Sequence, residues 1–382
     1  MGTNTAPRRR GVAGWATPGA TIPAPMARVG ILGLPNVGKT TLFNALTSLS
    51  ALTAAHPFST TEPNVGVAKV PDDRLDRMSQ LEDSDKTTHA TIDLLDLPAM
   101  AGSSGSGFGA QFFGRLREME ALAVVLRAFH DDAVPDADSG VDPVTQAETL
   151  LLELTLADAE VFSRRALKAG KESMSDASLK PVAAAIARAA AHLEEGLPLR
   201  VGTWTDQERA AFRDLAPLTM KPAVWVVNVD EGSTASEGAA MVGAVVPDGD
   251  LVVALSARIE EEAAQLDPQD RIELLDGLGL GEGALATMVR AIYTALGLLS
   301  FFTVGPKESR AWTVRAGAPA PEAAGKIHSD LERGFIRAEV LPIDAVIDAG
   351  GWDPAKAAGL VRLEGKDYVV AEGDVIVVRF SV

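Results

Sequence analysis

The sequence predicts an α/β protein in which a nucleotide-binding domain with a parallel sheet precedes a smaller α+β module. A phosphate-binding motif at residues 33–41 lies between an apolar run and a helical pattern. Further short apolar runs end in polar residues, as buried parallel strands do. After Phe301 the chain becomes rich in short alternating segments. A chain of 382 residues has room for two or three domains.

The phosphate-binding segment Gly33–Thr41 reads G-L-P-N-V-G-K-T-T and fits the P-loop pattern G-x-x-x-x-G-K-[ST]. The apolar run Arg28–Leu32 precedes it as a strand, and a helical pattern follows at Leu42–Leu46. This order places the free amide groups and the positive end of the helix dipole where a phosphate would sit. A glycine-rich turn with a stray lysine is the weaker interpretation.

In this loop we expect Lys39 to reach the β- and γ-phosphates and the Thr40 hydroxyl to bind Mg²⁺. The residues of the motif expected to contact the nucleotide are Asn36, Val37, Gly38, Lys39, Thr40 and Thr41.

Two further segments supply candidate switch residues. The loop at 56–64, H-P-F-S-T-T-E-P-N, contains Thr60, which we interpret as a switch threonine rather than an ordinary turn hydroxyl. The next buried strand, Ala90–Asp96, ends in Asp96, the natural Walker B carboxylate. The expected catalytic set is therefore Lys39, Thr60 and Asp96, and the expected Mg²⁺ ligands are Thr40, Thr60 and Asp96.

The middle of the chain predicts strands and a helical insertion. A helix is expected over Ala110–Met119, followed by a central strand at Ala121–Leu126. Asp142 then supplies an N-cap, with a proline at the first helical position, and Pro181–Leu193 forms a second helix. The two helices predict a hairpin inserted at about residues 140–215, which is either a partner-binding arm or a packed helical layer.

Two more strands, Pro222–Asn228 and Asp250–Leu255, end in polar loops at the edge where α/β sheets bind ligands. The candidate base-contacting residues are Asn228, Val229, Glu231, Ser256 and Ala257. The module at 299–382 is expected to contain a short helix at Ala323–Leu331 and strands before and after it.

Composition and domain boundaries complete this picture. The net charge of −17 argues against non-specific wrapping of nucleic acid by the whole surface. The absence of cysteine excludes disulfides and thiolate chemistry and suits a cytoplasmic setting. No apolar run is long enough to span a membrane. Because the sequence contains no dimerisation signal, we expect a monomer. Residues 1–25 are expected to be a disordered extension, with Met26 as the hypothetical true start, before a nucleotide-binding domain at 26–298.

After Met26 the chain resembles the YchF or Obg-like ATPase family of P-loop NTPases. The motifs that carry this resemblance are the P-loop, the 56–64 loop, N-V-D-E at 228–231 and the run from F-F-T-V-G-P-K-E-S-R-A-W-T-V to R-L-E-G-K-D-Y-V-V-A-E-G-D-V-I-V-V-R-F. The resemblance implies a Ras-like domain, a coiled-coil-like insertion and a C-terminal β-grasp (TGS) module. It also implies contact with the ribosome, through the large subunit or ribosomal RNA.

The resemblance also implies a preference for ATP, because Glu231 replaces the aspartate of the N-K-x-D motif that accepts hydrogen bonds from guanine. Asn36 resembles a P-loop asparagine that helps to hold K⁺ in some relatives; a turn residue is the alternative.

Three departures from the family concern hydrolysis. The D-x-x-G motif ends in Ala99, the glycine-rich loop beyond it is shorter than in the family, and a histidine with an ascribed catalytic part aligns with Val124. The expectation is a ribosome-associated switch that binds ATP and hydrolyses it slowly. The alternatives are a nucleotide-bound scaffold with weak catalysis and a GTPase.

Overall fold

The computed structural model describes residues 27–48, 64–97, 109–131, 142–232, 235–278, 280 and 283–381. They form two compact units. The large unit comprises Met26–Pro71 and Thr91–Gly297, and the C-terminal unit includes Asp72–Ala90 and Leu298–Val382. The extension expected at 1–25 lies outside the described residues.

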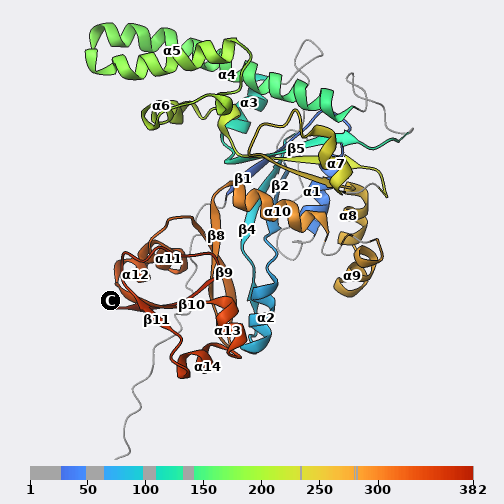
Figure 1. Ribbon diagram of the computed structural model, residues 1–382, viewed down its shortest axis with the longest axis vertical. Coiled ribbons are helices and arrows are strands. Elements are labelled where there is room, and N and C mark those ends of the chain that lie inside the picture. Colours follow the sequence, from blue (N-terminus) through green and yellow to red (C-terminus); the bar gives the residue numbers. More distant parts are fainter. Residues whose placement is uncertain are drawn as a thin grey trace, which may run out of the picture. The chain divides into compact units, whose positions relative to one another are not determined.

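The large unit is built on a six-stranded sheet (Figure 1). Its strands are β1 (Arg28–Leu32), β2 (Asn64–Lys69), β4 (Thr91–Asp96), β5 (Ala121–Ala128), β6 (Ala223–Val229) and β7 (Leu251–Leu255). Their order is β2-β4-β1-β5-β6-β7; β2 is antiparallel to β4, and all other neighbours are parallel. The central strands are buried along their length, which explains their continuous apolar sequences.

Helices of the large unit connect these strands. They are α1 (Lys39–Ser48), α3 (Ala110–Arg117), α4 (Pro143–Ser175), α5 (Lys180–Glu194), α6 (Asp206–Phe212), α7 (Ala235–Val242), α8 (Ala257–Ala264), α9 (Pro268–Gly277) and α10 (Ala284–Ala295). Short 3₁₀ turns occur at Ala177–Leu179, Leu199–Val201, Arg213–Leu215 and Leu218–Met220. The strand-helix alternation confirms the α/β class.

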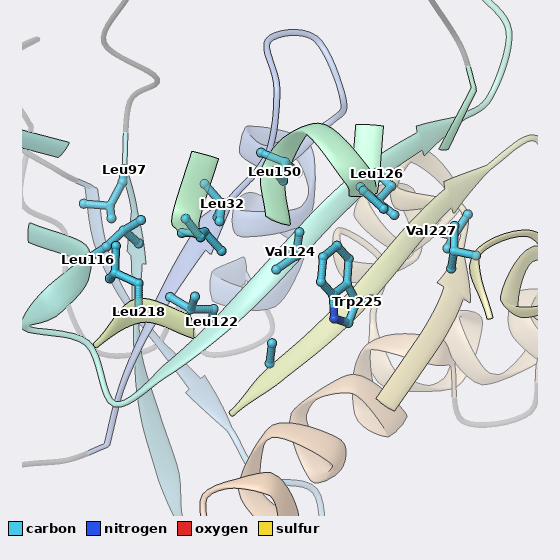
Figure 2. Packing of buried hydrophobic residues seen from close by; sticks show 14 of the residues in the cluster. Leu32, Leu97, Leu116, Leu122, Val124, Leu126, Leu150, Leu218, Trp225 and Val227 are labelled. Carbon is cyan, nitrogen blue, oxygen red and sulfur yellow. The ribbon is translucent and has the colours of Figure 1, made fainter. Parts of the chain in front are cut away.

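An apolar cluster fastens the start of α4 to the sheet (Figure 2). Leu32 of β1, Val124 of β5 and Trp225 of β6 lie in it, each at most 1% exposed, together with Leu150 of α4. Burying such side chains contributes about 1.5–3 kcal/mol each. The cluster therefore fixes the sheet whose strand ends carry the candidate site.

The helical arm, α4 with α5, is an antiparallel hairpin with a core of its own (Figure 1). Asp142 caps α4 by accepting hydrogen bonds from the amides of Val144 and Thr145. Along the arm, Phe162, Ile186 and other apolar residues pack with Trp204 and Phe212 of the following segment. Despite its length, α4 lacks the apolar character needed to cross a bilayer, as does every other helix in the described ranges.

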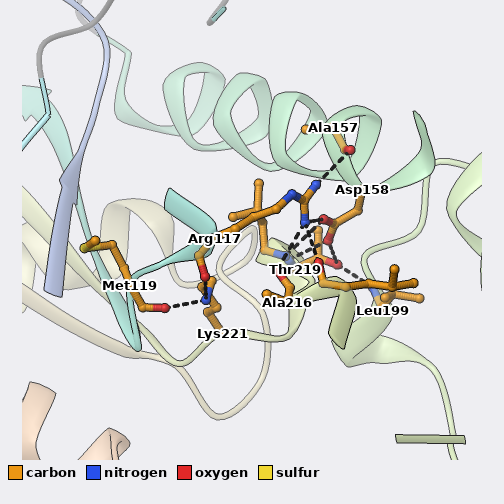
Figure 3. A network of polar contacts seen from close by, with 10 residues as sticks. Arg117, Met119, Ala157, Asp158, Leu199, Ala216, Thr219 and Lys221 are labelled. Atoms are coloured by element: carbon orange, nitrogen blue, oxygen red, sulfur yellow. Dashed lines mark hydrogen bonds and ion pairs between the residues drawn. The ribbon is translucent and has the colours of Figure 1, made fainter. Parts of the chain in front are cut away.

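A buried carboxylate ties the arm to the body of the large unit (Figure 3). Asp158 of α4, fully buried, accepts hydrogen bonds from Arg117 Nη1 at 2.7 Å and from the backbone amides of Leu218 and Thr219 at 3.0 and 2.8 Å. The Thr219 hydroxyl donates a further bond to it at 2.8 Å. Because Arg117 ends α3, this network joins three segments that are distant in sequence.

The C-terminal unit holds a second six-stranded sheet, of order β11-β10-β12-β8-β9-β3. Its strands are β3 (Thr87–Thr88), β8 (Leu298–Thr303), β9 (Ser309–Arg315), β10 (Phe335–Pro342), β11 (Arg362–Glu364) and β12 (Asp374–Phe380). Its helices are α2 (Asp73–Leu81), α11 (Ala320–Ile327), α12 (Ser329–Arg333), α13 (Ile343–Asp348) and α14 (Trp352–Ala357). This mixture of strands and short helices agrees with the predicted α+β module.

Two expectations need correction here. Asp72–Ala90, assigned from the sequence to the nucleotide-binding domain, belongs to the C-terminal unit. There β3 pairs with β9, and α2 packs on α13 because its fully buried Leu75 and Met78 need apolar cover. The single helix expected at Ala323–Leu331 is two helices, because extended backbone at His328 ends α11 and its side chain caps α12.

Replacing Asp158 by alanine should destabilise the large unit. The change leaves the guanidinium of Arg117 without its counter-charge, and we expect the free energy of unfolding to fall by about 3–5 kcal/mol. Urea unfolding followed by tryptophan fluorescence measures this. The control Glu160→Ala removes an exposed carboxylate from the same helix and should cost less than about 0.5 kcal/mol. Equal unfolding midpoints for the two variants would contradict the assignment.

Candidate functional site

The phosphate-binding segment forms a tight loop between β1 and α1. Gly38 has a φ of 94°, in the left-handed region, and a Cβ at this position would lie 2.4 Å from Asn228 Nδ2. A Cβ on Gly33 would lie 2.6 Å from the carbonyl oxygen of Val125. Both ends of the loop therefore require glycine. The loop leads directly into α1, whose first backbone amides are free to bind a phosphate.

Lys39 is folded back over the loop. Its Nζ donates a hydrogen bond to the carbonyl oxygen of Leu34 at 2.7 Å. Burial lowers the pKa of Lys39 to about 8, and the negative charge of Asp96 opposes that shift only in part. The amino group of Lys39 is thus held inside the loop, and Asp96 is the carboxylate whose charge acts on it. An incoming anion would favour the charged, protonated form of Lys39.

Thr40 and Asp96 come together from two different elements. Asp96 ends β4 and is 6% exposed, and Thr40 lies in the first turn of α1. The Thr40 hydroxyl donates to Asp96 Oδ2 at 3.3 Å. A hydroxyl and a carboxylate oxygen at this separation are a ligand pair of the kind that Mg²⁺ prefers. Within the described residues, no group of three or more His, Asp or Glu side chains gathers to form another metal site.

Asn228 bridges the P-loop and the loop that follows β7. Its Nδ2 donates to the carbonyl oxygen of Val37 at 3.0 Å, and its Oδ1 accepts from the amide of Ala257 at 2.9 Å. The side chain is 6% exposed, so both bonds are shielded from water. In the structure its amide group holds two loops together, and the contact with a base that the sequence predicted for Asn228 stays a prediction.

The remaining candidates of the predicted base loops differ in exposure. Glu231 is exposed and lies 3.7 Å from Arg258 Nε, measured from Oε1. Val229 is 4% exposed, with its side chain in the apolar cluster, so only its backbone faces the loop. Ser256 caps α8, its Oγ accepting from the amide of Ile259 at 3.5 Å.

Other loop residues complete the account. Asn36 adopts a φ of 63°, which agrees with the turn role considered for it. Thr41 is half-buried in the first turn of α1, and the side chain of Val37 is buried. Val124 lies fully buried in the apolar cluster beside Leu150 and Trp225 (Figure 2), so this position presents no polar group.

Two sequence candidates lie outside the described residues. Thr60, the proposed switch threonine, falls in the stretch 49–63, and Ala99 falls in the stretch 98–108. The structure therefore assembles Lys39, Thr40 and Asp96 but leaves the two switch predictions as predictions.

Sequence reasoning missed one polar link at this edge. Asp230, within the N-V-D-E motif, accepts hydrogen bonds from the backbone amide of His130 through both carboxylate oxygens, at 3.2 Å each. This bond joins the loops after β5 and β6. A single Asp in a short polar loop carries no signal for such a contact, because the partner is a backbone group about a hundred residues away.

Comparisons with known proteins place this arrangement among nucleotide-binding proteins. Residues 28–157 match the family model described as "50S ribosome-binding GTPase". Residues 298–381 match the model for the C-terminal domain of YchF GTPases, described as a protein of unknown function.

Individual relatives match over nearly the whole chain. The ribosome-binding ATPase YchF of Bacillus subtilis is 40% identical over 92% of this chain and 99% of its own length. The protein of the same name from Escherichia coli O157:H7 is 39% identical over 93% and 99%. The solved structure of the Schizosaccharomyces pombe YchF GTPase covers 94% of this chain and 98% of its own, with 29% identity and a TM-score of 0.82.

The pKa of Lys39 generates a prediction about pH. Above about pH 8 the free protein loses the ammonium charge, so triphosphate binding must take up a proton and becomes weaker. Between pH 7 and pH 9 we expect affinity to fall about tenfold. Isothermal titration calorimetry in two buffers of different ionisation enthalpy measures both effects. Lys39→Met should bind weakly with no such pH dependence, and a flat profile for the unaltered protein would contradict the role.

A second prediction concerns the bridge made by Asn228. In Asn228→Asp the carboxylate can still accept from Ala257, but it cannot donate to the carbonyl oxygen of Val37. An unmatched buried acceptor costs about 1–3 kcal/mol, so the Kd for a triphosphate should rise roughly 5- to 150-fold. Asn44→Asp makes the same chemical change at an exposed position of α1 and should have little effect. Equal affinities for the two variants would show that the Asn228 bridge does not support triphosphate binding.

Proposed function

The chain belongs to the YchF family, and on that premise we propose that it is an ATP-dependent switch that acts at the ribosome. It binds ATP, hydrolyses it slowly to ADP and phosphate, and changes its switch segments in the process. The observation that carries this proposal is the intact phosphate site, in which Lys39 and the Thr40–Asp96 pair meet at a loop that only glycine permits. Its relatives are named ribosome-binding ATPases.

In the proposed complex the amides of residues 36–41 surround the β- and γ-phosphates, and Lys39 turns from Leu34 toward their oxygens. Breaking its hydrogen bond to a neutral carbonyl is offset by pairing with an anionic oxygen, which is a stronger acceptor. The low polarity around Lys39, visible in its depressed pKa, strengthens that pairing.

Mg²⁺ fits the oxygens of Thr40 and Asp96, with Thr60 as the proposed third protein ligand. When bound, it would neutralise charge that develops on the phosphate oxygens. The chain's own part is to position the γ-phosphate and the attacking water through the closed switch segments; water is the nucleophile, so no protein nucleophile is needed. Binding of K⁺ by Asn36 is a further proposal. The left-handed backbone at this position is an independent reason for an asparagine there, with or without K⁺.

The nucleotide base is the point on which the names of the relatives differ, since the curated proteins are called ATPases and the solved structure a GTPase. Glu231 favours ATP. It is longer than the aspartate of N-K-x-D, and its carboxylate lies within 3.7 Å of Arg258 Nε. Guanine would leave its paired donors poorly matched there, whereas the single amine of adenine can be met by one acceptor. Ser256 and Ala257 complete the proposed base pocket.

The second candidate function is a nucleotide-bound scaffold with weak catalytic activity. Ala99 replaces a glycine that would be free to adopt positive φ, and Val124 offers only an apolar side chain. Neither change touches the phosphate loop, so binding is expected to survive even where turnover is slow. The ribosomal partner, a cytoplasmic location and a monomeric state remain part of the proposal.

The deciding experiment titrates the protein with fluorescent ATP and GTP in Mg²⁺ and K⁺ and follows phosphate release in the same samples. We expect ATP to bind at least about tenfold more tightly than GTP. Glu231→Asp should narrow that ratio, and Lys39→Ala should bind both nucleotides only weakly.

Release of phosphate supports the switch ATPase, and Ala99→Gly should then accelerate it. Tight ATP binding without release, in the presence of ribosomes as well as without them, would establish the scaffold instead. Tighter binding of GTP would overturn the role given to Glu231.

A further inference from the structure

A groove lies along one side of the C-terminal sheet, where the edge strand β11 and its neighbours β10 and β12 contribute side chains. It has a volume of about 580 Å³ and lies over β10, β11 and β12. Its lining residues are Ile336, Arg337, Glu339, Leu363, Val378, Arg379 and Phe380. None of these residues belongs to the nucleotide site or to the network around Asp158.

The charges in this groove are unbalanced toward the positive. Glu339 is buried and serves two cations, accepting from Arg379 Nη2 at 2.6 Å and from Lys356 Nζ at 2.8 Å. Those two bonds keep the pKa of Glu339 below its usual value in spite of burial. Arg337 has no ion pair with any described residue.

The register of the sheet places two of the positive charges on neighbouring positions. Arg337 and Arg379 are direct cross-strand partners in the antiparallel pair β10–β12. Like charges directly opposite each other destabilise a sheet. An anion bound at this pair would meet Arg337 and those donors of Arg379 that are not bonded to Glu339.

The rest of the groove is lined by apolar side chains, most of which are exposed. Ile336 is 49% exposed, Leu363 is 60% exposed, and the ring of Phe380 is 37% exposed at the end of β12. Large apolar side chains beside arginines are typical of protein-protein contacts, where aromatic residues and arginine are enriched.

We infer that this groove binds a segment of a protein partner in which carboxylate side chains stand beside large apolar ones. The carboxylates pair with Arg337 and Arg379, and the apolar side chains cover Ile336, Leu363 and Phe380. The inference goes beyond the proposed function, because it needs neither nucleotide binding nor turnover.

A protein segment fits the groove better than single-stranded RNA. Phosphates would satisfy the two arginines equally well, but RNA binding relies on aromatic platforms for successive bases. The groove offers one ring, Phe380, and otherwise aliphatic side chains that bases do not need. The aliphatic lining therefore decides between the two classes of partner.

The test uses the full chain and a fluorescein-labelled octapeptide that alternates leucine or phenylalanine with aspartate, measured by fluorescence anisotropy. Three probes are compared with it: the same peptide with asparagine for aspartate, a peptide with serine for the apolar residues, and a uridine octanucleotide. We expect the acidic, apolar peptide to bind most tightly. Each of the other three probes should bind at least about tenfold more weakly.

Arg337→Glu should weaken binding of the acidic peptide by at least about tenfold. It should not destabilise the fold, because it replaces a repulsive cross-strand pair with an attractive one. Leu363→Ser should weaken binding without loss of charge. Lys307→Glu makes the same change in net charge at an exposed position in the turn between β8 and β9 and should leave binding unchanged.

Three results would overturn the inference. They are tighter binding of the oligonucleotide, with loss in Arg337→Glu; equal binding of the acidic peptide to Arg337→Glu and Lys307→Glu; and no measurable binding of the peptide. ATP titration of the same variants separates this test from that of the proposed function, since none of these positions lies in the nucleotide site.

Discussion

The two hydrogen bonds of the Asn228 side chain determine the arrangement on which the whole nucleotide site depends. They join the carbonyl oxygen of Val37 in the P-loop to the amide of Ala257 at the start of α8. Gly38 has no side chain, and that space is occupied by the Asn228 amide group, 2.4 Å from where a Cβ would stand. The P-loop is therefore braced by the same strand end that introduces the proposed base loop, so the two halves of a nucleotide would meet preset surfaces.

Rigidity at the strand ends is matched by rigidity beneath the arm. Asp158 joins α4 to the end of α3 through Arg117, and α3 directly follows the stretch 98–108 that contains the D-x-x-G position. A buried carboxylate with four donors leaves little freedom at that joint. A displacement of α3 would thus move α4 at Asp158, because the groups that bond to this carboxylate have few alternative partners.

Much of this architecture could be predicted from local patterns. The P-loop, the strands around it and the capped start of α4 at Asp142 all follow from motifs or periodicity that a short window contains. The bridge by Asn228 and the burial of Asp158 could not, because each depends on partners 29 to 191 residues away. A charged residue in an amphipathic helix is normally expected on the solvated face. The break at His328 was likewise hidden, since one residue of extended backbone leaves the helical pattern on either side unchanged.

The segment Asp72–Ala90 has a consequence for the order in which the molecule is made. Its α2 buries Leu75 and Met78, and its β3 pairs with β9, in a unit whose other described residues begin at Leu298. During synthesis from the N-terminus this segment emerges more than two hundred residues before its partners. Its apolar helix face must therefore wait uncovered while most of the chain is translated. The C-terminal unit can close only after the strands from β8 onward have been made, around a piece of chain made early.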